Sequence, residues 1–166
     1  MVNNKIIVIN GMGTSGKSTF ITLCKEINNH VVEISTIDFV KSIAKLCGWD
    51  GIKTEKNRRF LSDLKDLLSD WDDVPNKKID EYILNHSNQI IFINAREPEN
   101  IDYFKNKYNA TTCIVKNNRV KNIKTNHADM NVFNYNYDMT IENNGTIEEL
   151  FQKAKEFMQN IENRKE

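Results

Sequence analysis

The chain has 166 residues, of which 39% are hydrophobic and 28% are charged, a composition typical of a globular domain. Lys+Arg and Asp+Glu both number 23, so the formal net charge is zero, which argues against a large binding surface for polymeric nucleic acid. No apolar run approaches the roughly 20 residues of a membrane span, and three widely separated cysteines favour neither a disulfide framework nor a metal site. We therefore expect a cytoplasmic protein without a membrane partner.

Five apolar runs predict buried strands, and helical patterns fill the gaps between them. The runs are residues 5–10, 31–35, 89–95, 111–116 and 137–143. Strands that alternate with helices predict an α/β fold, in which right-handed crossovers join a parallel sheet. The gap between the second and third runs is longer than one crossover needs, so we expect a helical, acceptor-binding insertion at residues 49–86 within a single domain of residues 1–166.

The segment directly after the first run matches the P-loop pattern G-x-x-x-x-G-K-[ST], with a strand predicted before it and a helix after it. Backbone N–H groups of such a loop, with the positive end of the following helix, bind phosphate oxygens. Lys17 is predicted to reach the terminal phosphates of ATP, and Ser18 to coordinate Mg²⁺. A simple glycine turn is the alternative, and the lysine and hydroxyl weigh against it. The predicted ATP-binding residues here are Gly11, Gly13, Thr14, Ser15, Gly16, Lys17, Ser18 and Thr19.

Three further segments carry candidate residues for the second substrate. Asp38 follows the second run, where it is expected to orient metal-bound water or the acceptor; alternatively it is a helix N-terminal acid with Thr36 as the cap. Arg58 and Arg59 begin an amphipathic helix of the insertion, and Arg96 follows the third run. Arginine binds phosphate through two parallel hydrogen bonds, although a surface salt bridge is the alternative for each arginine.

The insertion also contains an apolar stripe at helical spacing. Its members are Phe60, Leu61, Leu64, Leu67, Leu68 and Trp71. A proline breaks the helical pattern after the stripe, and a second helical pattern follows. Trp49, Phe39, Tyr82 and Trp71 are aromatic candidates for stacking on a base, but we favour core packing as the role of each.

A polar and basic segment at residues 117–136 follows the fourth run, and we expect it to close over bound phosphates as a lid. Its cations include Arg119, Lys121 and Lys124. Arg119 is the candidate that neutralises charge in the transition state. A solvated helix face is an equally good interpretation of the segment, and His127 is expected to form local hydrogen bonds rather than to act in catalysis.

The fifth run leads into the turn Asn143-Asn144-Gly145 and a final helix. Thr146 is predicted to cap that helix, with Glu149 completing a capping box. In the expected topology the turn lies beside the P-loop, so Asn144 and Gly145 are predicted to pack against the adenine of ATP.

Two other nucleotide-binding classes fit the sequence less well. Guanine-specific switch proteins need an N-K-x-D motif, and in the segment that begins at Asn76 the residue Ile79 replaces the aspartate. Motor ATPases and ring-forming enzymes usually have longer chains. A small domain with a helical insertion instead fits a kinase that closes over a small acceptor.

The chain resembles the P-loop nucleoside monophosphate kinases, most closely the phage-type deoxynucleoside monophosphate kinases. The similar segments are NGMGTSGKSTF, STIDFVKSIAKLCGWDGIKTEKNRRFLSDLKD, INAREPENI and DMTIENNGTIEEL. The resemblance implies a five-stranded parallel sheet in the order 2-3-1-4-5, and transfer of the ATP γ-phosphate to a nucleoside monophosphate with Mg²⁺. It also implies that Arg96 and either Arg58 or Arg59 bind the acceptor. The third run ends in Asn94-Ala95-Arg96, so the aspartate that usually supplies a second contact to Mg²⁺ is absent.

The sequence therefore predicts an ATP-dependent kinase for a (deoxy)nucleoside monophosphate, with Lys17, Arg119 and Asp38 as catalytic residues. Its partners are expected to be small nucleotides, and the chain is expected to be a monomer or a homodimer. Two alternatives stay open. One is a kinase for another small acceptor, such as dephospho-coenzyme A or a phosphorylated metabolite, and the other is a nucleotide-binding regulator with weak catalysis.

Overall fold

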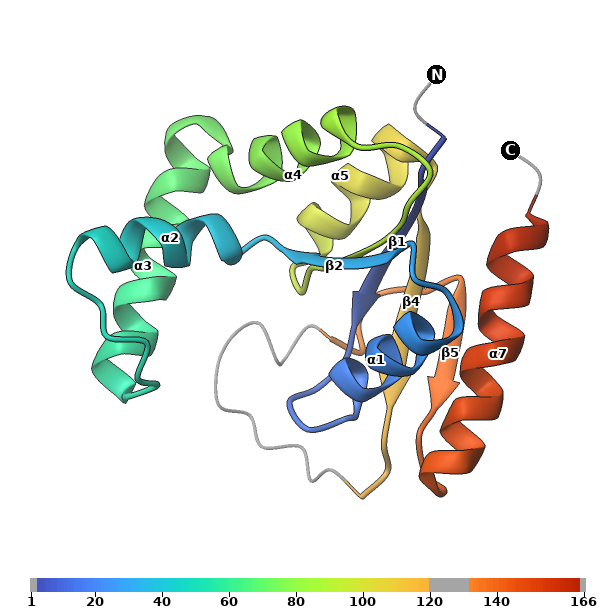
Figure 1. The fold of residues 1–166 in the computed structure, drawn as a ribbon. Coiled ribbons are helices and arrows are strands. Elements are labelled where there is room, and N and C mark those ends of the chain that lie inside the picture. Colours follow the sequence, from blue (N-terminus) through green and yellow to red (C-terminus); the bar gives the residue numbers. More distant parts are fainter. Residues whose placement is uncertain (1–2, 120–131, 165–166) are drawn as a thin grey trace. The chain divides into compact units, whose positions relative to one another are not determined.

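The computed structural model describes residues 3–119 and 132–164. Five strands form one sheet in the order β2-β3-β1-β4-β5 (Figure 1). They are β1 (Lys5–Asn10), β2 (Val31–Ser35), β3 (Ile90–Asn94), β4 (Thr111–Lys116) and β5 (Met139–Glu142). The predicted α/β class, parallel sheet and strand order are thus confirmed. None of the helices in the described ranges is long and apolar enough to cross a lipid bilayer.

The carboxyl ends of the parallel strands form one edge of the sheet, with the central strand β1 in its middle. Strand β1 pairs in parallel with β3 and with β4, so that Ile7 lies opposite Phe92 on one side and Thr111 on the other. Strand β5 continues the sheet in parallel beyond β4. Because parallel strands end at the same edge, the segments that follow β1, β3, β4 and β5 all leave the sheet there.

The described chain divides into two compact units. Of the described residues, the first unit contains 34–87, and the second contains 3–33, 88–119 and 132–164. The insertion that we predict at residues 49–86 falls inside the first unit, which also includes the end of β2 and helix α2 (Asp38–Leu46).

Three helices make up the first unit. Helix α3 (Glu55–Asp72) packs against both α2 and α4 (Val74–Asn85). Thr54 caps α3, since its side chain accepts a hydrogen bond from the backbone N–H of Asn57 at 3.1 Å. Asp73 adopts a left-handed conformation that ends α3 and begins α4.

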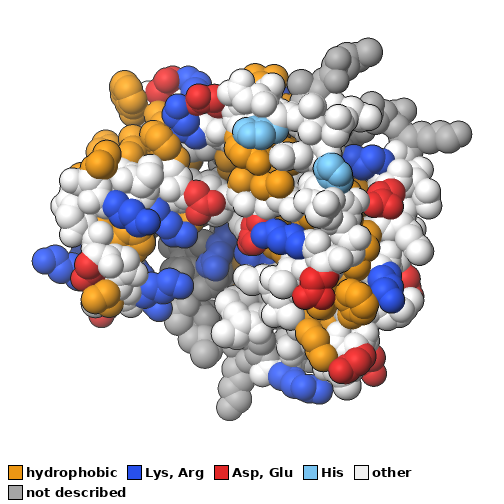
Figure 2. All heavy atoms as spheres, in the orientation of Figure 1, with side chains coloured by type: hydrophobic (Ala, Val, Ile, Leu, Met, Phe, Trp, Pro, Cys, Tyr) orange, Lys and Arg blue, Asp and Glu red, His pale blue; other side chains and the backbone are white. Residues whose placement is uncertain are grey.

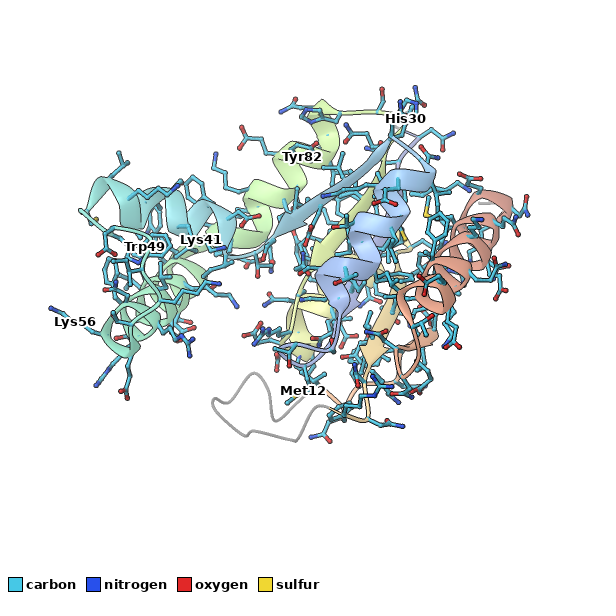
Figure 3. The ribbon with its side chains drawn as sticks, turned by 60° about the horizontal axis from the view of Figure 1, so that its bottom comes forward. Met12, His30, Lys41, Trp49, Lys56 and Tyr82 are labelled. Atoms are coloured by element: carbon cyan, nitrogen blue, oxygen red, sulfur yellow. The ribbon has the colours of Figure 1, made fainter. Side chains whose placement is uncertain are left out.

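The apolar stripe of α3 is only partly covered within its unit. The side chains of Leu67 and Trp71 are 65% and 76% exposed, so the expectation that Trp71 packs in a core is wrong. The physical reason is that the stripe is wider than the face that α2 and α4 cover. Figure 2 shows hydrophobic side chains gathered over the α2–α3 part of the chain. Trp49 and Tyr82, also expected in a core, are half-buried in the same unit (Figure 3).

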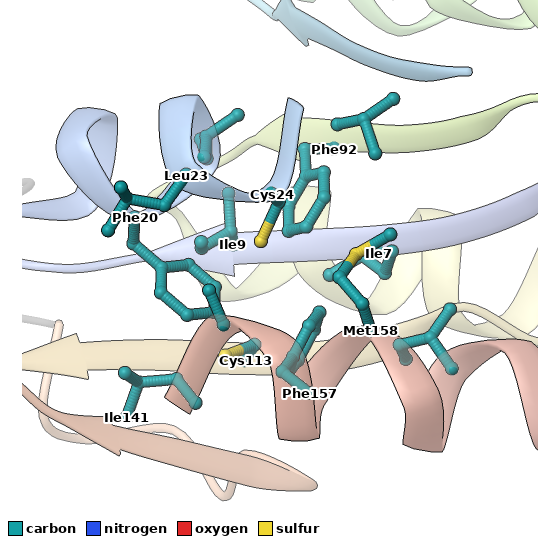
Figure 4. Packing of buried hydrophobic residues seen from close by; sticks show 14 of the residues in the cluster. Ile7, Ile9, Phe20, Leu23, Cys24, Phe92, Cys113, Ile141, Phe157 and Met158 are labelled. Atoms are coloured by element: carbon teal, nitrogen blue, oxygen red, sulfur yellow. The ribbon is translucent and has the colours of Figure 1, made fainter. Parts of the chain in front are cut away.

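The second unit contains the main hydrophobic core, with α1 (Lys17–Ile27) and α7 (Ile147–Asn163) packed against each other and the sheet (Figure 4). The rings of Phe20 and Phe157 meet edge to face at 5.3 Å between centroids. Helix α5 (Pro98–Tyr108) contacts β1 and β4 through a separate set of buried residues that includes Phe104. The central strands are buried at consecutive positions, and their side chains point alternately to the two sides, so they supply apolar surface to both faces of the sheet.

One local prediction in this unit, the cap of the last helix, is confirmed. Thr146 is the N-cap of α7, and its hydroxyl accepts a hydrogen bond from the N–H of Glu149 at 3.3 Å. The two cysteines of this unit, Cys24 and Cys113, are buried free thiols. Burial raises the pKa of Cys24 to about 12 and raises the pKa of Cys113 as well, so both thiols stay protonated and pack as small apolar groups.

Candidate nucleotide-binding site

The loop between β1 and α1 has a backbone that few residues adopt. Thr14 has a φ of 64°, a left-handed value that is uncommon outside glycine. Gly16 has a φ of 93°, and a Cβ added there would lie 2.1 Å from Nδ2 of Asn143. Strained backbone of this kind concentrates at sites that clamp ligands. Both the conformation and the close approach therefore require glycine at position 16.

Helix α1 begins at this loop and directs the backbone N–H groups of its first turn toward it. Gly16 is its N-cap, and the first helical hydrogen bond runs from Phe20 N to Gly16 O at 2.9 Å. The N–H groups of Ser18 and Thr19, in the first turn, consequently have no carbonyl partner within the helix. Together with the positive end of the helix dipole, these donors form an arrangement that attracts an anion.

Ser15 supplies a buried hydroxyl at the same place. Its side chain is only 1% exposed, and Oγ has no hydrogen-bond partner among the described residues. A cavity of about 380 Å³ borders the loop. The residues that line this cavity are Met12, Ser15, Val115, Lys116, Asn117, Asn118 and Phe133 (Met12 is labelled in Figure 3). Because buried polar atoms are normally satisfied, the hydroxyl fits a loop that binds a polar ligand.

The loop is anchored by a residue that no sequence motif identifies. Asn10, the last residue of β1, is fully buried, and its Oδ1 accepts a hydrogen bond from Gly11 N at 2.8 Å. Its Nδ2 donates to Tyr137 Oη at 2.8 Å and to Arg96 O at 3.3 Å. Burial raises the pKa of Tyr137 to about 12, which keeps its hydroxyl protonated and able to donate to Val132 O at 2.9 Å. The available signal was a polar residue at the end of an apolar run.

The turn after β5 lies against the loop, as the expected topology requires. Asn143 Nδ2 donates to Ser15 O at 2.9 Å. Asn144 is bound to the segment after β4 from two sides: its Oδ1 accepts from Asn118 N, and its backbone O accepts from Arg119 Nη2, both at 2.8 Å. Three segments that are far apart in the sequence therefore meet around the P-loop.

Arg119 is exposed and is held at this turn by its bond to Asn144. Its predicted action in the transition state stays a prediction. Most of the segment that we expect to act as a lid, including Lys121, Lys124 and His127, lies outside the described residues.

Asp38 already has a structural role at the start of α2. Its Oδ2 accepts a hydrogen bond from Ser35 N at 2.8 Å, and Oδ1 lies 3.5 Å from Nζ of Lys41. The alternative of a helix N-terminal acid therefore has a geometric basis. The cap itself differs from the expectation, since Ile37 and not Thr36 is the N-cap residue. Thr36 is buried, and no side chain caps α2 by a hydrogen bond.

The three arginines predicted to bind the acceptor fall on both units. Arg96, in the second unit, is half-exposed in the segment between β3 and α5. Arg58 and Arg59 belong to the first unit and are exposed on the first turns of α3. Arg59 Nε lies 3.8 Å from Asp63 Oδ2, but these side chains are 84% and 70% exposed, so the ion pair holds the guanidinium weakly.

The described residues contain no group of three or more His, Cys, Asp or Glu side chains placed to hold a metal ion. The exposed hydroxyl of Ser18, in the first turn of α1, is an oxygen donor of the kind that Mg²⁺ prefers. Ser18 therefore fits a magnesium ion that takes its other ligands from phosphate and water.

Comparisons with known proteins define the fold. No family model matches the chain, and no curated protein matches it. Among solved structures, a dephospho-CoA kinase from Campylobacter jejuni is 16% identical, with a TM-score of 0.57 over 95% of this chain and 97% of that chain. A shikimate kinase from Aquifex aeolicus is also 16% identical, with a TM-score of 0.55 over 93% and 96% of the two chains.

An APS kinase from Mycobacterium tuberculosis, solved in complex with AMPPNP and APS, is 10% identical. Its TM-score is 0.53 over 96% of this chain and 99% of that chain. At these identities the likeness shows the fold, which is that of the P-loop kinases. The reaction and the acceptor of this protein have to be inferred from its own residues.

Proposed function

We propose that this protein is an ATP-dependent phosphotransferase. The observation that carries the proposal is the loop of residues 11–18, in which left-handed backbone, the N-terminus of a helix and a buried hydroxyl meet behind a central parallel strand. A loop that only joined a strand to a helix would need neither the strain at Thr14 nor an unpartnered Ser15 Oγ. Bound phosphate oxygens account for all three features.

Each residue of the loop has a defined part in this proposal. The N–H groups from Gly13 to Ser18 bind the phosphates, and the ammonium of Lys17 neutralises the terminal ones. Ser18 supplies one oxygen ligand to Mg²⁺, which when bound offsets charge on the transferred group. The backbone of Asn144 and Gly145 borders the adenine, since Asn143 ties that turn to the loop.

The acceptor in this proposal is a (deoxy)nucleoside monophosphate. Arg96 and one of Arg58 and Arg59 bind its phosphate, because a guanidinium fork matches two phosphate oxygens. The two α3 arginines are adjacent, and adjacent helix positions point about 100° apart, so they serve different surfaces. Asp38 orients the acceptor, and Arg119 neutralises the charge that develops during transfer.

Phosphoryl transfer asks the protein mainly for position and charge. The reaction needs the attacking and leaving oxygens in line and the negative charge spread over the phosphoryl group neutralised. The residues assigned above hold these oxygens in line and neutralise this charge, without forming a covalent intermediate. A small acceptor is supported by the names of the solved structures with this fold, which are kinases of dephospho-CoA, shikimate and APS.

A turnover screen tests the acceptor class. We expect ADP to form when ATP and Mg²⁺ are supplied with at least one of the deoxynucleoside monophosphates. ADP formation with dephospho-coenzyme A or another phosphorylated metabolite, and with no nucleoside monophosphate, would favour the other kinase assignment. Tight ATP binding by calorimetry without turnover on any acceptor would favour a nucleotide-binding regulator.

Two lysines of α1 provide a matched test of the P-loop assignment. Lys17→Ala is expected to reduce turnover by at least about 100-fold, because it removes a charge that acts on the transferred group. Lys25→Ala, at the other end of the same helix, removes only an exposed ion pair to Glu33 at 3.5 Å and should keep turnover within about twofold. Melting curves should show both variants folded. Wild-type turnover in Lys17→Ala would make the assignment wrong.

A further inference from the structure

Helix α3 carries an apolar surface that its own unit leaves open. Phe60, Leu67 and Trp71 are 37%, 65% and 76% exposed, and Leu64 between them is half-buried. Residues spaced by three and four positions share one face of a helix, so these four side chains form a continuous stripe. We call this the α3 stripe.

Charge is separated along the same helix. Residues 55–65 carry four cations and two carboxylates, a net charge of +2, whereas residues 66–72 carry three carboxylates and no cation, a net charge of −3. Lys56 extends away from the unit at the basic end (Figure 3). A surface with one basic and one acidic half complements a copy of itself that runs in the opposite direction.

The apolar side chains follow the same symmetry. Take a two-fold axis through the midpoint between Lys65 and Asp66. Phe60 and Trp71 lie equally far from that midpoint. In two antiparallel copies of α3, Phe60 of one copy therefore lies opposite Trp71 of the other. Leu64 and Leu67 are also equally far from the midpoint, so Leu64 of one copy lies opposite Leu67 of the other at the centre of the stripe. Large aromatic side chains thus flank a central pair of leucines, which gives a surface that matches itself in shape.

The flank of the stripe supplies the charge pairs. At 100° per residue, Arg59 and Asp70 project on the same side of the stripe. A two-fold axis perpendicular to the antiparallel helices keeps that side common to both copies, so Arg59 of one copy lies near Asp70 of the other. Each contact occurs twice, as in any symmetric dimer.

We propose that the α3 stripe is the interface of a homodimer in which two α3 helices pack antiparallel. The proposal depends on the exposed apolar stripe and on the charge symmetry, and it does not rest on the proposed function. The occupant of the stripe is a second copy of this chain, because only a copy of itself repeats both the order of apolar residues and the reversed order of charges.

Sedimentation equilibrium of the full chain without nucleotide tests the association. The wild type is expected to form a concentration-dependent dimer, and Leu67→Glu is expected to weaken it at least about tenfold by placing charge at the centre of the stripe. Leu84→Glu is the matched control, since Leu84 on α4 is also 65% exposed but lies off the stripe. Circular dichroism checks that each variant is folded. A monomeric wild type at all concentrations, or equal effects of the two variants, would overturn the proposal.

A charge exchange tests the antiparallel register. Arg59→Asp and Asp70→Arg should each raise the dimer dissociation constant several-fold, since each places like charges together across the axis. The double variant should return it to near the wild-type value. Loss of dimer in the double variant beyond that of either single variant would rule out the register. The emission of Trp71, measured in a Trp49→Phe background, should move to shorter wavelength as the dimer forms, which locates the interface at the stripe.

Discussion

Gly16 and Gly13 lie in the same loop but meet different physical constraints. Gly16 has a left-handed backbone, and an added Cβ would collide with the amide of Asn143. Gly13 is exposed, and a Cβ added there meets no atom within 4 Å. The motif requires glycine at position 16 and allows any residue at position 13, and the backbone and the contact with Asn143 give the physical reason for this difference.

We therefore expect Gly16→Ala to lower the free energy of unfolding by about 1–2 kcal/mol, the cost of a left-handed alanine and a displaced neighbour. Gly13→Ala should change it by less than about 0.5 kcal/mol. Urea unfolding followed by circular dichroism measures both. Equal losses in the two variants would show that the collision with Asn143 does not constrain the loop.

Residues of the candidate site differ in how well local patterns predict them. Lys17 and Ser18 follow from a short motif, because a P-loop needs its residue types at fixed spacing. Asn10 carries no such signal, since its three partners lie at Gly11, Tyr137 and Arg96. The role of Arg96 is still a prediction, but its backbone is shown to be tied to the strand that precedes the loop.

Asp138 connects elements of the second unit just before β5. Its Oδ2 accepts hydrogen bonds from the N–H of Thr112 at 2.8 Å and from the Thr112 hydroxyl at 2.9 Å. Its Oδ1 pairs with Nζ of Lys105, on α5, at 2.9 Å. Partial burial acts to raise the pKa of Asp138, but the hydrogen bonds from Thr112 and Lys105 outweigh it and lower the pKa below its ordinary value. The carboxylate thus fastens β4, α5 and the start of β5 together.

This pKa shift predicts how stability responds to acid. Because the folded pKa of Asp138 is lower than the unfolded one, its stabilisation is fully present above the unfolded pKa, near pH 4, and is lost as the pH falls toward the folded pKa. Asp138→Asn should destabilise the fold at pH 7 by on the order of 1 kcal/mol. It should also flatten the decline in stability below pH 4. Urea midpoints of both proteins between pH 7 and pH 3 measure this, and parallel curves would contradict it.

Helices and strands were predictable because they follow from periodicity and from caps. The five apolar runs correspond to the five strands, and Thr146 caps α7 as its spacing with Glu149 predicts. The start of α2 was less predictable, since Ile37 and not Thr36 is its N-cap. There a turn closed by Asp38 onto Ser35 N replaces the side-chain cap that local preference favours.

At the scale of the molecule, nucleotide binding should couple to the stability of the fold. The proposed phosphate site exists only when β1, α1 and the turn after β5 are assembled, so we expect a nonhydrolysable ATP analogue with Mg²⁺ to bind only the folded chain. At 100 times the dissociation constant it should stabilise the protein by about 2.7 kcal/mol, which raises the melting temperature by roughly 5–10 °C for a chain of this size. Differential scanning calorimetry measures the shift.

Lys17→Ala should remove most of that increase, while Lys25→Ala should keep it. An increase of equal size in the Lys17→Ala protein would place the nucleotide somewhere other than the loop of residues 11–18. This measurement reports binding alone, so it separates failure of the proposed site from failure to find the right acceptor in a turnover screen.

The amino-acid sequence by itself determined the α/β class, the order of elements and the P-loop, because each depends on residues close together in the chain. The tertiary structure decided what surrounds that loop: Asn10 beneath it, Asn143 against Ser15, and Arg119 on Asn144. It also decided that the α3 stripe is open rather than buried. Contacts between distant residues and the exposure of a helix face depend on how the elements pack, and a local pattern of residues does not predict that packing.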